Sequence, residues 1–479
     1  MSDTKECPFC LETIKAGALR CKHCHADLTE TSPAPGVASP AAASAPTPPA
    51  PAALEAGQVL DLLSHLVDKN LVVYEEEEDG QGRYRLLETV RQYSRDKLME
   101  AAGPERARQR HLTHFLSLAE QAAQHIYGAG QATWQKRLER EHDNLRAAME
   151  WSLIAEGQEE AALRLVGALA QFSVMGSHLR EGGAWATRAL ATGRNAPPLV
   201  LARALDAGWT CFLFQGDYET ARSLAEEGLR FARKAQDRQA ISYALFGVGL
   251  LAAHRGEFET ALASAEEGMA LAQAEGDRWN TGRHLVVLGL ETWMRGDYAA
   301  SRAFFRETLE ISRALADEWH IGMTLANLGF VTRGVGDCDE ARALHREGLS
   351  LCQRLGDRRG VAWHLVSMAG IEVDKGRADH AARLLGAAAA VLEAIGSPLP
   401  PPQQREYDRT QEQTQALLGQ GTFAAFFAEG GAMTLEQAVA YAAREEGHQP
   451  GAPGAEAGAG PADPQQGGRQ HADRHGDLQ

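Results

Sequence analysis

Four cysteines near the start of the chain have the spacing of a metal site. Cys7 and Cys10 are separated by two residues, as are Cys21 and Cys24, which gives the pattern C-x2-C-x10-C-x2-C. Each pair can direct two thiolates at one point, and four thiolates suit tetrahedral zinc. Residues 1–28 carry too little apolar surface to fold alone, so the metal would supply most of the folding free energy. We therefore predict a structural zinc on these cysteines; rubredoxin-like iron, a redox dithiol or unligated thiols are the alternatives.

This head resembles a small bacterial zinc-ribbon family. The matching motifs are Cys7-Pro8-Phe9-Cys10, Ile14-Lys15, Cys21-Lys22-His23-Cys24 and Asp27-Leu28. The family usually has glycine after each cysteine pair, where this chain has Leu11 and His25. The basic and acidic side chains of residues 1–28 balance, so we favour contact with protein, or a purely structural role, over binding of nucleic acid.

Composition narrows the class of protein. The 479 residues carry 48 Lys and Arg against 64 Asp and Glu, a net charge of -16. Phosphate binding depends on clustered basic side chains, so the chain as a whole is not expected to bind nucleic acid or anionic lipid. No secretory signal and no apolar run long enough for a membrane span is visible in the sequence. We expect a soluble, cytoplasmic protein.

The centre of the chain repeats itself at a constant interval. Glycines, leucines and aspartates each recur with the same spacing: Gly176, Gly216, Gly256, Gly296, Gly336 and Gly376; Leu205, Leu245, Leu285, Leu325 and Leu365; Asp237, Asp277, Asp317 and Asp357. A fixed period of about 20 to 50 residues is typical of a solenoid, in which each unit buries its apolar face against its neighbours. We predict stacked helix pairs over residues 197–396.

One unit shows how each helix pair is built. In residues 278–317, the pattern predicts a first helix from Trp279 to Met294, a turn at Arg295-Gly296-Asp297 and a second helix from Tyr298. Glycine suits the left-handed end of the first helix, and aspartate caps the second. Leu288-Gly289, Gly296-Asp297-Tyr298 and Ser301 resemble the tetratricopeptide repeat, although the unit exceeds the common 34-residue form by about six residues. The resemblance implies an α-solenoid.

The segment before the array resembles another family. Residues 57–101 alternate between helical and strand patterns: a helix, a strand at Leu71–Tyr74, a charged turn, a strand at Arg83–Leu87 and a second helix. With the run Glu141 to Ala148, this looks like the part of bacterial LuxR-type and AfsR-type regulators and related predicted ATPases that follows their nucleotide-binding domain. The family's P-loop is absent, since the dipeptide Gly-Lys does not occur. Without it no triphosphate site is expected.

These patterns predict a mostly α fold. It comprises an α-solenoid of tetratricopeptide-like hairpins, a small N-terminal zinc ribbon and a partial winged-helix segment. The predicted divisions are a zinc ribbon (1–28), a Pro/Ala-rich disordered linker (29–56), the partial winged helix (57–103), two long helical pairs leading into the array (104–196), 40-residue repeats (197–396), capping helices (397–447) and a disordered tail (448–479).

The first helices of a solenoid face its concave groove, where partners bind. We predict that this groove holds a peptide or a ligand with a carboxylate, because aromatic and arginine side chains alternate along it: Arg203, Tyr243, Phe246, His254, Arg283, Trp293, Met323, Phe330, Arg333 and Trp363.

The predicted function is that of a non-enzymatic interaction or effector-sensing scaffold in signalling or transcriptional regulation. Its partner would be a protein or peptide, or a small effector, and its cofactor a structural zinc. Two alternatives remain open: a nucleic-acid-associated regulator acting through the zinc ribbon and partial winged helix, and an accessory subunit that docks onto a separate ATPase.

Overall fold

The computed structural model describes residues 4–6, 13–15, 56–76, 82–100 and 104–444. The four cysteines of the predicted zinc site, all but the last residue of the predicted linker and the whole predicted tail lie outside these ranges. Within the head, strands β1 (Thr4–Glu6) and β2 (Thr13–Lys15) pair antiparallel, with Lys5 opposite Ile14.

A helix–strand–strand–helix segment precedes the array. Its elements are α1 (Ala56–Asp68), β3 (Val72–Glu76), β4 (Gly82–Leu86) and α2 (Glu88–Glu100), and the two strands pair antiparallel with Tyr74 opposite Tyr84. The order matches the predicted winged-helix pattern. Large hydrophobic side chains stay exposed here: of the fifteen that are exposed among the described residues, eleven fall between Val59 and Met99. This segment alone therefore does not bury its apolar surface.

Six helices lead into the array, where the sequence predicted two long pairs. They are α3 (Pro104–His125), α4 (Gln131–Arg140), α5 (His142–Ile154), α6 (Glu159–Ala168), α7 (Ala170–Met175) and α8 (Leu179–Thr192). The predicted number of four long helices was wrong: α3 spans 22 residues, but the five helices after it have 6 to 14 residues each. Gly157, with φ of 78°, follows α5, and Ser177, with φ of 61°, follows α7.

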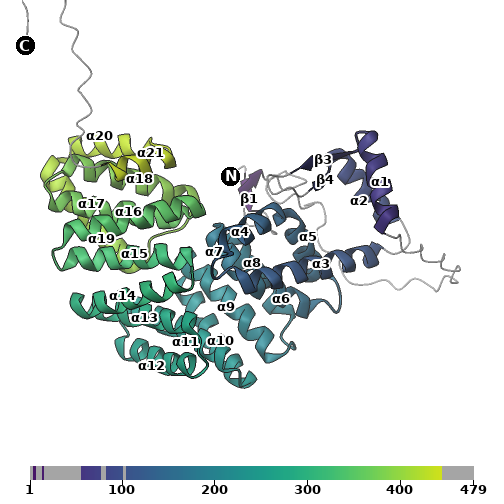
Figure 1. Cartoon of the computed structure of the whole chain (residues 1–479), viewed down its shortest axis with the longest axis horizontal. Helices are drawn as coiled ribbons and strands as arrows, with labels where there is room; N and C mark the ends of the chain where they lie inside the picture. The colour runs from purple at the N-terminus through teal and green to yellow at the C-terminus, as the bar shows by residue number, and fades with distance from the viewer. Residues whose placement is uncertain (1–3, 7–12, 16–55, 77–81, 101–103, 445–479) are drawn as a thin grey trace, which may run out of the picture. The chain divides into compact units, whose positions relative to one another are not determined.

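The array consists of five antiparallel helix pairs stacked side by side (Figure 1). The pairs are α9 (Pro198–Gln215) with α10 (Tyr218–Ala235), α11 (Arg238–Arg255) with α12 (Phe258–Ala274), α13 (Arg278–Met294) with α14 (Tyr298–Ala314), α15 (Glu318–Gly334) with α16 (Cys338–Leu355), and α17 (Arg358–Asp374) with α18 (Ala378–Ile395). The predicted α-solenoid of tetratricopeptide-like hairpins is confirmed.

The periodic glycines form the turns within the pairs, and the periodic aspartates lie between pairs, where each caps the first helix of the next pair. Gly216, Gly256, Gly296, Gly336 and Gly376 all have left-handed φ angles between 74° and 92°, which glycine adopts without steric cost. Asp297 then caps α14 by accepting from the backbone N–H of Ala300 at 3.0 Å, and Asp277 caps α13 in the same way. Gly176 differs, since its φ is -78° and the left-handed residue there is Ser177.

Small residues let the two helices of a pair approach each other. A Cβ atom added at Gly289 would lie 2.8 Å from the Phe305 ring, and one added at Gly329 would lie 2.6 Å from His345. On the second helices, Ala221, Ala261, Ser301, Ala341 and Ala381 are fully buried. The repeat in the sequence therefore encodes the close packing of each hairpin.

Three helices follow the array: α19 (Pro401–Leu418), α20 (Gln420–Gly431) and α21 (Leu435–Ala443). Helix α20 packs directly on α18, where a Cβ at Gly386 or Gly430 would collide with the backbone of the facing helix.

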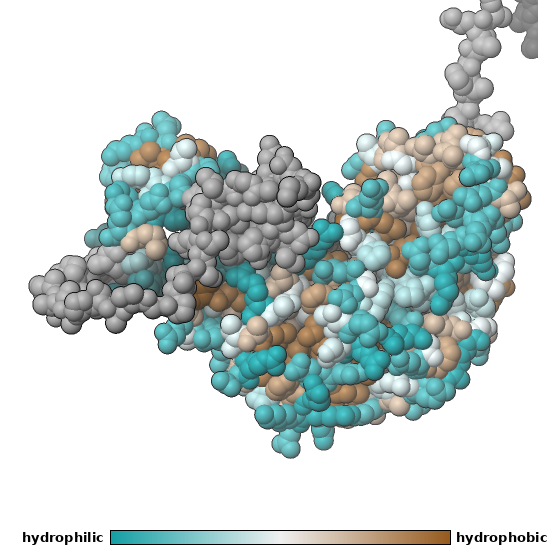
Figure 2. Space-filling view, turned by 180° about the vertical axis from the view of Figure 1, so that it is seen from behind, coloured by the Kyte–Doolittle hydropathy of each residue, from teal (hydrophilic) through white to brown (hydrophobic). Residues whose placement is uncertain are grey.

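On the face in Figure 2, hydrophilic side chains cover much of the array, with hydrophobic residues between them. Within the described ranges, the chain forms no helix with the length and apolarity that a membrane span requires.

Candidate ligand chamber

The first helices of the array surround a pocket, which we call the chamber. All five first helices, α9, α11, α13, α15 and α17, contribute to its wall, and α7 and the start of α19 complete it. Its lining comprises Gln171, Trp209, Thr210, Leu213, Phe214, Tyr243, Phe246, Leu250, His254, Trp279, Arg283, Val286, Leu290, Trp319, His320, Met323, Thr324, Asn327, Trp363, Pro400 and Gln403.

One register position of the repeat supplies much of this wall. Tyr243, Arg283, Met323 and Trp363 occupy the same position in four successive units, and each lines the chamber. The solenoid places equivalent residues of consecutive units side by side. Four different side chains at one register position therefore meet in a single cavity.

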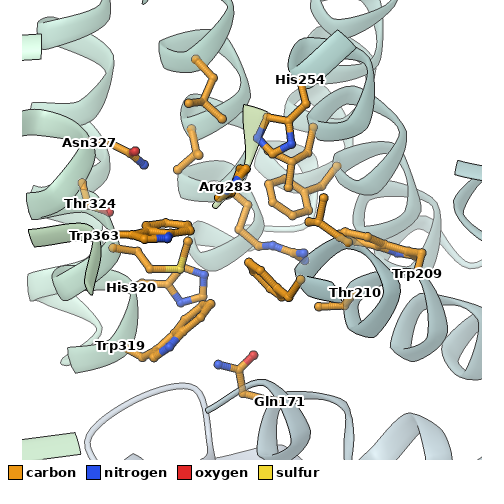
Figure 3. Close-up of a pocket in the computed structure, with 18 of the residues that line it drawn as sticks. Gln171, Trp209, Thr210, His254, Arg283, Trp319, His320, Thr324, Asn327 and Trp363 are labelled. Carbon is orange, nitrogen blue, oxygen red and sulfur yellow. The ribbon is translucent and has the colours of Figure 1, made fainter. Parts of the chain in front are cut away.

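Arg283 lies at the centre of the chamber (Figure 3). Its guanidinium carbon is 3.7 Å from the centre of the Phe246 ring, 3.9 Å from that of Tyr243 and 4.5 Å from that of Trp279. The side chain is 6% exposed. The negative faces of aromatic rings attract a cation, so these rings offset part of the cost of burying the guanidinium.

No carboxylate among the described residues forms an ion pair with Arg283, which donates a long hydrogen bond of 3.4 Å to Asn280 Oδ1. Asp206 is buried on neighbouring α9, where it accepts a hydrogen bond from Trp209 Nε1 at 3.2 Å. Burial raises the pKa of Asp206 to about 7, against the opposing effects of Trp209, Arg283 and Arg203. Asp206 therefore does not act as a full counter-ion to Arg283.

Several polar atoms of the chamber wall have no hydrogen-bond partner within the described part of the chain. They belong to side chains that are at least nine-tenths buried: Gln171 Nε2, His254 Nδ1, Trp319 Nε1 and Trp363 Nε1. A buried N–H without an acceptor costs about 1–3 kcal/mol. Three of these four groups can only donate, so a ligand that supplies acceptors would satisfy them.

Contacts between distant parts of the chain hold the chamber closed. Gln131, at the start of α4, donates to Asp317 Oδ1 at 3.0 Å and accepts from the backbone N–H of Trp319 at 2.8 Å. On the opposite side, Ser397 Oγ donates to the carbonyl of Phe214 at 2.7 Å. The Arg359 guanidinium stacks 3.5 Å from the centre of the Phe214 ring. The concave face is thus a partly closed chamber rather than an open groove.

The structure brings six of the ten predicted groove residues into the chamber and places four outside it. Those inside are Tyr243, Phe246, His254, Arg283, Met323 and Trp363. Trp293 and Phe330 lie outside the chamber and form an edge-to-face pair, with 4.5 Å between the centres of their rings. Arg333 forms ion pairs with Asp374 and Glu406. Arg203 is exposed and lies outside the chamber, at the point where Gly167 of α6 packs against α9.

Sequence reasoning missed several residues of the wall. Trp279 and Trp319 occupy equivalent positions of successive units, one helical turn before Arg283 and Met323 on the same helices. Their spacing of 40 residues could have indicated that both tryptophans line the same surface as Arg283 and Met323. Gln171 and Gln403 come from outside the repeats, and nothing in the repeat pattern indicated them.

A second cluster of titratable side chains joins α4, α5 and α8. His142 Nε2 lies 2.7 Å from Glu181, and His178 Nε2 lies 3.0 Å from Glu139. In the described part of the chain, Glu139, His142 and His178 are also the group whose ligand atoms are close enough to share a metal ion. Arg146 contacts Glu181 at 2.6 Å. Because each carboxylate already has a cationic or histidine partner, we interpret this cluster as an ion-pair network.

Two family models match parts of the chain: a winged helix-turn-helix domain over residues 49–99 and a tetratricopeptide repeat over residues 321–394. Proteins named as HTH-type transcriptional regulators, from Mycobacterium bovis and Mycobacterium tuberculosis, are 35% identical to it over 205 residues. That match covers 41% of this chain and 23% of each relative. The chain therefore spans about a quarter of the length of these relatives.

Solved structures of helical-repeat proteins are similar at low identity. A Rap protein complexed with competence and sporulation factor has a TM-score of 0.47 at 11% identity, covering 69% of this chain and 99% of that one. A signal transduction ATPase with numerous domains and a tetratricopeptide repeat sensor, from Pyrococcus horikoshii, has a TM-score of 0.39 at 14% identity, covering 77% and 57%. This chain thus combines a segment that matches winged helix-turn-helix domains with a tetratricopeptide array, and part of it is similar to mycobacterial regulators.

Proposed function

We propose that this protein is a non-enzymatic scaffold of signalling or transcriptional regulation that binds an effector, a small molecule or a short peptide segment, in the chamber. The observation that carries the proposal is the chamber itself. Among the described residues, its wall combines aromatic side chains, an arginine without an ion pair and unsatisfied donors. Pockets that are mostly apolar with a few convergent polar groups are typical of ligand sites. The similarity to transcriptional regulators supports a regulatory context.

The alternative, binding of nucleic acid through the winged-helix segment, has weaker physical support. The family match favours it. However, residues 56–100 hold six Lys and Arg against ten Asp and Glu. Helix α1 carries no Lys or Arg. Phosphate contacts provide most of the affinity for DNA, so we expect no shift of duplex DNA by the full chain at physiological salt.

A chamber-filling variant tests the proposed function. Thr210 lines the chamber and is half-buried, so Thr210→Trp places an indole inside it. Thr260→Trp, an exposed position on α12, is the matched control. We expect native mass spectrometry after incubation with a cell extract to show a bound small molecule or peptide on the wild type and on Thr260→Trp, and none on Thr210→Trp. Equal retention by all three proteins would remove the chamber from the proposal.

We also propose that Cys7, Cys10, Cys21 and Cys24 hold a structural zinc. The support is the pattern C-x2-C-x10-C-x2-C, which suits four thiolate ligands. Elemental analysis of the full chain should give about one zinc per molecule. Replacing Cys21 and Cys24 by serine should remove it, whereas Cys338→Ser, a half-buried cysteine of the array, should keep it. Iron in place of zinc, or zinc retained by the double variant, would refute this assignment.

A further inference from the structure

We infer that the chamber binds a small oxyanion with an apolar body, whose charged group lies against the Arg283 guanidinium. This inference rests on the proposed function and adds the chemical class of the effector. It follows from three properties of the wall: the unpaired cation, the unsatisfied donors and the aromatic surface around them, all within the described residues.

The unpaired cation is the first property. Burying a guanidinium costs several kcal/mol unless a counter-charge or hydrogen bonds compensate. Arg333, which is also buried in the array, has carboxylate partners: it contacts Asp374 at 2.5 Å and also pairs with Glu406. Arg283 has aromatic faces and one long contact to an amide. An oxyanion from solution would provide the missing charge, and the fork of the guanidinium matches two oxygens of such a group.

The donors are the second property. Gln171 Nε2 and the indole N–H groups of Trp319 and Trp363 require acceptors, and an oxyanion offers acceptor lone pairs without donors of its own. Figure 3 shows Trp319 and Trp363 on one side of Arg283 and Gln171 entering the chamber from another direction. A cationic or donor-rich ligand would leave these groups unpaired.

The aromatic wall is the third property. Trp209, Tyr243, Phe246 and Trp279 line the chamber together with aliphatic residues such as Leu250 and Leu290. This surface can bury an aromatic ring or a short aliphatic chain. The chamber is partly closed and is lined by several helices, which favours a small molecule over a folded partner.

Matched pairs of anionic and neutral probes test the inference on the full chain. The anions are 2-naphthoate and 1-naphthyl phosphate, and their neutral counterparts are 2-naphthamide and 1-naphthol. Binding is followed by isothermal titration calorimetry, with quenching of the chamber tryptophans as a second readout. We expect at least one anion to bind about tenfold more tightly than its neutral counterpart, because charge-assisted hydrogen bonds to a buried guanidinium are strong. The two anions distinguish a carboxylate from a phosphate ligand.

Three arginine variants separate the charge from the shape of the chamber. Arg283→Met should reduce the affinity for the anion to that for the neutral probe. The affinity for the neutral probe itself should change by less than about threefold, which would show that the chamber is intact. Arg283→Lys should retain part of the preference for anions. Arg203 occupies the equivalent register position outside the chamber. Arg203→Met should therefore change neither the affinity for the anion nor that for the neutral probe.

The outcomes also separate this inference from the proposed function. Suppose that the neutral and anionic probes bind equally well and that Thr210→Trp abolishes the binding of both. This result would overturn the assignment of an oxyanion ligand but leave the chamber as an effector site. Failure of all four probes to bind, or binding that Thr210→Trp leaves unchanged, would count against the oxyanion and the chamber together.

Discussion

Arg333→Met is expected to lower the free energy of unfolding by about 3 kcal/mol, because it removes the buried cation beside Glu406 and leaves that carboxylate with the more exposed Arg409. Arg333 and Glu406 are 7% and 6% exposed and pair across α15 and α19, and Arg333 also contacts Asp374 at 2.5 Å. Gly370 leaves room for the guanidinium, since a Cβ there would collide with it. Urea denaturation followed by circular dichroism measures the loss.

Two further variants show whether the buried ion pair causes that loss of stability. Arg333→Met combined with Glu406→Leu should recover most of the lost stability, because it removes the buried carboxylate that has lost its buried partner. Arg313→Met breaks an ion pair with Glu347 in which both side chains are about half exposed, and should cost less than about 0.5 kcal/mol. A loss in Arg333→Met no greater than in Arg313→Met would show that α19 is not held by this pair.

Mild acid should destabilise the array strongly. Burial lowers the pKa of His254, His284 and His364 to about 4, and lowers that of His345 well below its usual value. The unfolded chain protonates histidine near pH 6.5, whereas the folded chain does so near pH 4. The stability from neutral burial is therefore complete above about pH 6.5 and is lost as the pH falls toward 4.

One buried group opposes this trend. Asp206 has its pKa raised to about 7 by burial, so acidification relieves the cost of its ionised form. Each such group changes stability by about 1.4 kcal/mol per pH unit within its window. Between pH 6.5 and 5.5 each histidine costs about 1 kcal/mol and Asp206 returns about 1 kcal/mol, so three histidines and one carboxyl leave a net loss of about 2 kcal/mol, to which His345 adds.

The urea midpoint at the two pH values measures this effect. His364→Gln should flatten the slope of stability against pH, whatever it does to stability itself. His65→Gln changes an exposed histidine of α1 and should leave the slope as it is. A wild-type protein equally stable at pH 5.5 and 6.5 would mean that these histidines are not buried as neutral groups.

The array could be predicted from the sequence because its information is local and repeated. Gly296 and Asp297 specify a turn, Gly289 specifies a close helix crossing, and each feature recurs from unit to unit. The same register also places Tyr243 and Arg283 on one surface. Local patterns of this kind can be recognised in the sequence without knowledge of the tertiary structure.

The closure of the chamber could not be predicted, because it depends on contacts between segments that share no pattern. The hydrogen bonds of Gln131 with Asp317 and of Ser397 with Phe214 each join residues far apart in the sequence. Periodicity gave no indication that α6 packs against α9 at Arg203, or that α19 supplies Glu406 to Arg333. These non-repeating helices decide which concave residues face the cavity.

The most direct test of the chamber as an oxyanion site is a crystal structure of the full chain with the tightest-binding anionic probe. The account predicts electron density for the probe inside the chamber, with its carboxylate or phosphate oxygens within hydrogen-bond distance of the Arg283 guanidinium and its ring among the aromatic side chains. Density for the probe on another surface, or in the chamber with its charged group turned away from Arg283, would contradict it.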